Sequence, residues 1–148
     1  MKLIKGLLDY SIPWTIPDIY LFTGNPITKA NGAIVMGRGA AKQVRDTFPG
    51  IDKVFGQQVL EHGRGISLIW LKGGDQQYIG WFKVKEHWKL PADLSAIAAS
   101  ANALAITATA YSNRVFHMNY PGVGNGKLTE ADVSPYLKVL PDNVLIYR

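Results

Sequence analysis

Two glycine-rich segments constrain the fold of this 148-residue chain more than any other feature. The first ends in Gly37-Arg38-Gly39 and runs into a helical pattern, whereas the second, 121–127, follows an apolar strand pattern. Glycine allows left-handed backbone conformations and lets a ligand come close to the main chain. We therefore expect both segments to be strand-to-helix connections that offer backbone groups to a ligand.

Strand and helix patterns alternate along the chain, which is typical of an α/β sandwich with a largely parallel sheet. Strand patterns occur in six short stretches: 2–4, 19–23, 65–71, 77–83, 115–120 and 144–147. Helical patterns occur in four stretches, of which the first two are 38–47 and 51–61. The third is an apolar stripe from Leu94 to Ala108, and Pro91 is expected in the first turn of that helix. The last helix is expected to begin with a capping box formed by Thr129 and Asp132. The third and fourth strands should form a hairpin whose turn is Gly73-Gly74-Asp75.

The composition fits one domain over residues 1–148, because hydrophobic residues make up 47% of the chain and charged residues 18%. There is no cysteine, and the three histidines lie far apart without paired carboxylates, so we expect neither a metal site nor a cofactor. The net charge of +5 favours an anionic partner. Neither a targeting segment nor a membrane helix is recognisable, and we expect a cytoplasmic monomer.

Three segments that follow predicted strands, 24–39, 83–89 and 121–127, are expected to meet in one crevice. In parallel sheets the ligand lies beyond the carboxyl ends of the strands. The helix start near Gly39 offers unpaired N–H groups to a phosphate, and alternate glycines in 121–127 can turn successive N–H groups to one side. Together they predict a pyrophosphate held from both sides by backbone. The alternative for the first segment is a plain glycine-rich turn.

Neither glycine-rich segment has the pattern of a common nucleotide-binding loop. Lys42 occupies the place of the third glycine of the dinucleotide fingerprint. Leu128 occupies the place of the serine or threonine that binds magnesium in a P-loop. Hydrolysis of a nucleoside triphosphate is therefore not expected.

The segment 81–89 contains Lys83, Lys85, His87 and Lys89 at the end of a buried strand. Charged side chains are costly to bury unless they face a ligand or solvent. We therefore expect these side chains to border the same crevice. The alternative is a solvated basic turn.

Taken together, the motifs resemble those of a known family. They are Asn25, the run 29–43, Phe48-Pro49-Gly50, the segment from Phe82 to Trp88, and the run 121–128. Their order and spacing, from Ile19 to the end, are similar to those of the motifs in macro domains. More specifically, they resemble the branch that contains the DNA ADP-ribosyl glycohydrolase antitoxins and small phage and bacterial macro-like proteins.

The resemblance implies a three-layer α/β/α macro-type sandwich with a mixed, largely parallel sheet, and ADP-ribose as the ligand. The ligand-binding residues that it implies are Asn25, Asn31, Gly32, Val35, Met36, Gly37, Arg38, Gly39, Gly122, Val123, Gly124, Asn125 and Gly126. Lys85 falls on the position of a lysine that acts at the anomeric carbon in the glycohydrolase branch. His87 would assist as an acid or base, because its unperturbed pKa lies near neutrality.

Three positions depart from the family pattern. Leu7 follows Gly6, where macro domains usually have the aspartate that binds adenine. Gly126 and Lys127 stand where some deacylating relatives have a carboxylate. The stretch 81–84 replaces the usual Phe-Pro-Thr.

Four functions follow from these features. The first is hydrolysis of an ADP-ribosyl linkage on nucleic acid or protein. The second is a non-catalytic ADP-ribose-binding module, and the third is an ADP-ribose 1″-phosphate phosphatase. The fourth, from a different class, is a basic nucleic-acid-binding protein whose glycine loops are only structural.

Overall fold

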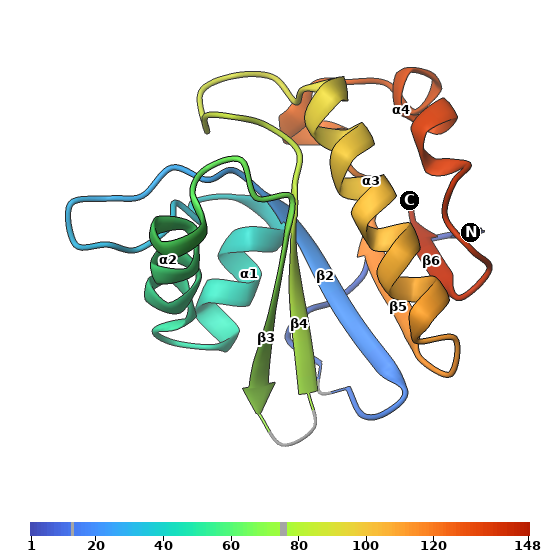
Figure 1. Ribbon diagram of the computed structural model, residues 1–148, viewed down its shortest axis with the longest axis horizontal. Coiled ribbons are helices and arrows are strands. Elements are labelled where there is room, and N and C mark those ends of the chain that lie inside the picture. The colour runs from blue at the N-terminus through green and yellow to red at the C-terminus, as the bar shows by residue number, and fades with distance from the viewer. Residues whose placement is uncertain (13, 75–76) are drawn as a thin grey trace.

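The computed structural model describes residues 1–12, 14–74 and 77–148, and within them a six-stranded sheet forms the central layer (Figure 1). The strands are β1 (Lys2–Ile4), β2 (Asp18–Gly24), β3 (Leu68–Gly74), β4 (Gln77–Lys83), β5 (Val115–Asn119) and β6 (Val144–Tyr147). Their order in the sheet is β1-β6-β5-β2-β4-β3. Only the β3–β4 pair is antiparallel, so the sheet is mixed and largely parallel, as predicted.

Helices cover both faces of the sheet, which confirms the predicted three-layer α/β/α sandwich (Figure 1). On one face lie α1 (Gly39–Thr47) and α2 (Ile51–His62), and on the other α3 (Leu94–Ala110) and α4 (Glu130–Leu137). Each face has its own apolar core. Representative side chains of the first core are Phe22, Val44 and Phe55, and of the second Ile97, Leu104 and Phe116. No helix in the described parts of the chain is long and apolar enough to cross a membrane.

Most predicted elements are confirmed, and two predictions were wrong in detail. The third strand begins at Leu68 and includes Gly73 and Gly74, so these glycines do not form the hairpin turn. Asp75 lies outside the described residues. Pro91 is not in the first turn of α3, because Asp93 is the N-cap and its carboxylate accepts a hydrogen bond from Ser95 N. The Thr129–Asp132 capping box is present at the start of α4.

Small residues of α3 allow it to lie close to the sheet and fix the end of β4. Ser100 is fully buried, and its hydroxyl donates to Lys83 O at 2.8 Å and to Ser67 O at 3.2 Å. Beside it, Gly24 and Lys83 are register partners, and Val84 N donates to Gly24 O. These contacts hold the carboxyl ends of β2 and β4 side by side in the sheet.

Candidate functional site

The connections that follow β2, β4 and β5 meet at the carboxyl ends of these parallel strands. A Cβ atom added to Gly39, at the start of α1, would lie 3.2 Å from Asn125 Nδ2, in the loop after β5. Lys85, just beyond β4, places its Nζ 3.4 Å from Asn125 O. These contacts show that the three segments meet, as expected, and the ligand crevice between them stays a prediction.

The N-terminus of α1 faces this crevice without a cap. Arg38 is the N-cap residue, with extended φ and ψ of −146° and 159°, and its side chain makes no capping hydrogen bond. The first N–H groups of an α-helix have no partner within the helix, and uncapped they attract an anion. Gly37, Arg38 and Gly39 are all exposed, so an anion could approach these N–H groups.

The second glycine loop, 121–127, has three residues in left-handed conformations: Gly122, Gly124 and Lys127, whose φ is 64°. Gly122 has a φ of 80° and Gly124 a φ of 76°, values that a side chain would strain. Within the loop Lys127 N donates to Gly124 O, and Leu128 N donates to Gly122 O. Among the described residues, no acceptor pairs with the N–H groups of Val123 and Gly124. They are therefore open to a ligand.

Three cationic side chains gather where these segments meet. Partial burial lowers the pKa of the Lys85 ammonium, and the nearby charges of Lys127 and Arg38 lower it further. The three cations come from three different connections, and their mutual repulsion would fall on binding an anion. The crevice thus combines unpaired N–H groups with positive charge, the arrangement that suits a diphosphate.

Lys83 does not belong to this cationic group, so the expectation that it borders the crevice was wrong. Its side chain is buried, and its Nζ lies 2.8 Å from both Arg64 O and the Glu86 carboxylate. Lys83 is the last residue of β4, and its ammonium is held by Arg64 and Glu86 and is not among the charges that act on Lys85.

His87, Trp88 and Lys89 form an exposed aromatic and basic surface next to Lys85. His87 Nδ1 accepts from Lys89 N at 3.1 Å, which leaves Nε2 as the free ring nitrogen. Lys89 Nζ lies 5.2 Å from the centroid of the Trp88 ring, and 47% of Trp88 is exposed. The hydrogen bond of His87 with Lys89 lies within its own turn and does not reach the rest of the site. The predicted role of His87 as an acid or base therefore stays a prediction.

Solved structures of known proteins share this fold. No protein-family model and no curated protein matches the sequence. The macrodomain of Mycobacterium tuberculosis DarG is 25% identical over 98% of this chain and 96% of that one, with a TM-score of 0.73. The macrodomain of Thermus aquaticus DarG is 21% identical over 99% of this chain and 95% of that one, with a TM-score of 0.74.

This chain has the macrodomain fold. A third neighbour, Thermosipho africanus DarTG, was solved in complex with ADP-ribose. It is 20% identical over 86% of this chain, which spans 37% of that protein, with a TM-score of 0.67. The resemblance to macrodomains, including those of DarG, is thereby confirmed.

The segment after β2 contains other residues that were predicted to bind the ligand. Asn25 is buried and Asn31 exposed, and each side-chain oxygen accepts from a backbone N–H two residues ahead, at 3.1 Å and 3.0 Å. Gly32 packs closely against Gly56 of α2. These bonds hold both asparagine oxygens within the segment, so a ligand would meet their amide nitrogens.

Val35 and Met36 offer less to a ligand than their neighbours do. Val35 N donates to Ile27 O at 2.9 Å and is therefore occupied. The Met36 side chain is 1% exposed and belongs to the core beneath α1. Gly126 is also buried, and its carbonyl accepts from Ala92 N. Backbone contacts by these residues remain predictions.

Two residues that sequence reasoning did not assign to ligand binding lie next to Lys85 or to the second glycine loop. Lys127 was noted only as a departure from the family pattern, yet its charge acts on Lys85. Ala92 lies against the second glycine loop, because a Cβ atom on Gly126 would come within 2.9 Å of Ala92 Cβ. Its proximity depends on tertiary contacts and has no signal in the sequence.

At the start of the chain, Leu7 is 79% exposed and provides no polar group where macrodomains usually have an aspartate. The nearby Asp9 carboxylate accepts from Ser11 and from Gln43 Nε2, and its hydrogen bonds with Ser11 are the main reason that its pKa is lowered. No cluster of three or more metal-binding side chains occurs within residues 1–12, 14–74 and 77–148.

Proposed function

We propose that this macrodomain binds the ADP-ribosyl group in the crevice between α1 and the second glycine loop. The observation that supports this most is the presence of unpaired N–H groups on both sides of the crevice, beside Arg38, Lys85 and Lys127. A diphosphate carries negative charge on both phosphates, and backbone donors together with cations complement it. That Thermosipho africanus DarTG was solved in complex with ADP-ribose supports this choice of ligand.

We further propose that the protein hydrolyses an ADP-ribosyl linkage, with Lys85 acting at the anomeric carbon of the distal ribose. Burial and neighbouring cations lower the pKa of Lys85, which raises the fraction of neutral amine. A neutral amine can attack the anomeric carbon, forming an N–C bond as the glycosidic bond breaks and the target group leaves with its electron pair. The target group takes up the proton that the amine loses. Water then adds to the same carbon as the N–C bond breaks, which releases ADP-ribose and restores the neutral amine. Alternatively, the charged amine stabilises negative charge on the leaving group.

The proposed substrate is an ADP-ribosylated nucleic acid. Beside Lys85, exposed Trp88 offers a flat surface on which a base can stack, and Lys89 offers charge to a phosphate. Stacking on aromatic side chains and contacts with cations are the usual means of binding single strands. An ADP-ribosylated protein is the alternative substrate.

The test is release of ADP-ribose from an ADP-ribosylated oligonucleotide by wild type, Lys85→Ala and the control Lys53→Ala. Lys53 is an exposed lysine of α2. We expect Lys85→Ala to lose about 100-fold or more in rate, while its ADP-ribose affinity stays within about tenfold, or about 1.4 kcal/mol. The control should match wild type in both measurements.

Three results would change this proposal. If the affinity of Lys85→Ala for ADP-ribose collapses, Lys85 is a binding residue. If wild type binds ADP-ribose but releases none from nucleic acid or protein, the protein is a reader. Faster phosphate release from ADP-ribose 1″-phosphate than release of ADP-ribose from either macromolecule would favour a phosphatase.

A further inference from the structure

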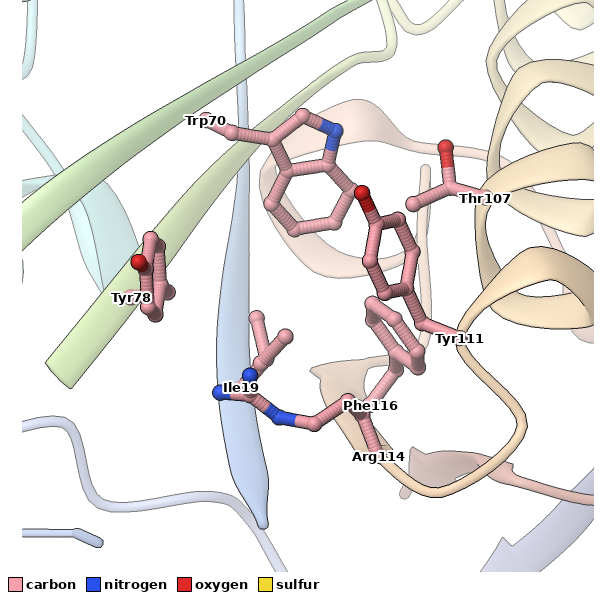
Figure 2. A pocket seen from close by; sticks show the side chains of 7 residues that line it. All are labelled: Ile19, Trp70, Tyr78, Thr107, Tyr111, Arg114 and Phe116. Atoms are coloured by element: carbon pink, nitrogen blue, oxygen red, sulfur yellow. The ribbon is translucent and has the colours of Figure 1, made fainter. Parts of the chain in front are cut away.

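A second cavity lies at the opposite end of the sheet from the glycine loops, at the amino-terminal ends of β2 and β5 (Figure 2). Its volume is about 250 Å³. The residues that line it come from four strands, from α3 and from the turn after α3, and they are Ile19, Trp70, Tyr78, Thr107, Tyr111, Arg114 and Phe116. Drug-sized ligands occupy pockets of about 300 Å³ or more, so this cavity suits a smaller molecule.

The walls of the cavity are flat aromatic rings held in place by the sheet. A Cβ atom on Gly80 would lie 2.5 Å from the Trp70 ring, so this glycine makes room for the indole to lie across β4. Trp70 and Phe116 pack edge to face, with ring centroids 5.7 Å apart. Tyr111, which is 57% exposed, borders the same space as Trp70 (Figure 2). An aromatic ligand would find rings on several sides.

Arg114 brings a partly unsatisfied positive charge to this apolar space. Its Nε donates to Pro17 O at 3.2 Å, and its Cζ lies 5.4 Å from the centroid of the Tyr78 ring. Its Nη2 is buried and has no hydrogen-bond partner among the described residues. A buried donor without an acceptor costs free energy, more so when it is charged. An anionic group in the cavity would be the charge that best matches the guanidinium.

The end of α3 makes the cavity more receptive to an anion than a helix C-terminus normally is. Free carbonyl groups there carry partial negative charge. Here the Asn143 side-chain amide donates to Ala108 O at 2.9 Å, to Tyr111 O at 3.3 Å and to Arg114 O at 3.0 Å. The same bonds fix the backbone that carries Arg114.

We infer that this cavity is a second binding site, for a small aromatic ring that carries a carboxylate. The ring would lie among Trp70, Tyr111 and Phe116, and the carboxylate would pair with the Arg114 guanidinium, which lines the cavity. The site is separate from the ADP-ribosyl crevice and goes beyond the function proposed for it.

Isothermal titration of wild type with phenylacetate and with its neutral isostere phenylacetamide tests the inference. We expect phenylacetate to bind with a dissociation constant of about 1 mM or tighter. Phenylacetamide keeps the ring and shape but lacks the charge, and should bind about tenfold more weakly. Equal affinities, or absence of phenylacetate binding in this range, would overturn the inference.

Two substitutions locate the site on the protein. Tyr111→Ala opens the cavity and should weaken phenylacetate binding about tenfold, whereas Tyr136→Ala, on α4 and outside the cavity, should not. Arg114→Gln should abolish the preference for the anion. The matched control is Arg148→Gln, because Arg148 pairs with Glu130 away from the cavity. If Arg114→Gln fails to fold, the comparison of phenylacetate with phenylacetamide and the Tyr111→Ala measurement still test the inference.

The two sites are tested independently by saturating the protein with ADP-ribose. Phenylacetate affinity should stay within about twofold, since the sites lie at opposite ends of the sheet. If ADP-ribose competes with phenylacetate, the ring occupies the glycine-loop crevice and the second site is refuted. If ADP-ribose does not bind at all, the proposed function fails while the phenylacetate result stands by itself.

Discussion

Gly124→Val is the substitution that most directly tests the second glycine loop. Gly124 has a φ of 76°, and an added Cβ meets nothing within 4 Å. The new side chain therefore projects into open space at the loop instead of colliding with the protein. A non-glycine residue in this conformation costs about 1–2 kcal/mol, which lowers the melting temperature of a domain of this size by roughly 2–8 °C.

The effect on binding should be much larger than the effect on folding. Wild type at an ADP-ribose concentration of about 100 times its dissociation constant gains about 2.7 kcal/mol of stability. If valine fills the space for the phosphates and weakens binding about 100-fold, the same concentration adds only about 0.4 kcal/mol. Thermal unfolding with and without ADP-ribose, together with calorimetric titration, measures both quantities.

Gly50→Val is the control for the backbone strain. Gly50 precedes α2 as its N-cap, has a left-handed φ of 88°, and likewise has nothing within 4 Å of an added Cβ. It should lose stability without losing ADP-ribose affinity. If folded Gly124→Val binds ADP-ribose as tightly as wild type, the loop does not hold the phosphates.

Three further predictions concern other parts of the structure. Thr129→Ala removes the side-chain acceptor of the α4 capping box and should lower the free energy of unfolding by about 1 kcal/mol in urea denaturation. Asn143→Ala removes bonds to three carbonyls and should cost about 1–3 kcal/mol by the same measurement. Folding lowers the pKa of Lys85 from its ordinary value of 10.5, so the protonated amine destabilises the folded state. This destabilisation is complete below the pKa of Lys85 in the folded state and decreases as the pH rises from there towards 10.5. Lys85→Met should therefore be more stable than wild type at neutral pH, with an advantage that shrinks in alkaline urea titrations; a constant difference would contradict the lowered pKa.

The sequence allowed the layers and the meeting of three loops to be predicted, because both depend on local patterns. Apolar alternation located β4 with its observed bounds, Gln77–Lys83, and glycine spacing located the loop 121–127. The end of β3 was misplaced because its last residues are glycines, which normally indicate a turn. Here Gly73 and Gly74 continue the strand through an irregular register.

The side-chain environments could not be predicted from the sequence. Lys83 resembled a surface lysine, but its partners Arg64 and Glu86 become visible only in the folded chain. The cations that act on Lys85 are Lys127 and Arg38, which come from other connections and are not its neighbours in the sequence. The cavity of Trp70 and Arg114 has no motif, because its residues are scattered from position 19 to position 116.

The strand order of the sheet also has a consequence for folding kinetics. Only β3 and β4 are hairpin neighbours, whereas β2 pairs with β4 and β5, and β1 pairs with β6 from the other end of the chain. Pairings between distant segments form slowly, because loop closure must precede the contacts that reward it. The crevice, built at the ends of β2, β4 and β5, is therefore complete only late in folding. A ligand bound there should slow unfolding and leave the folding rate nearly unchanged.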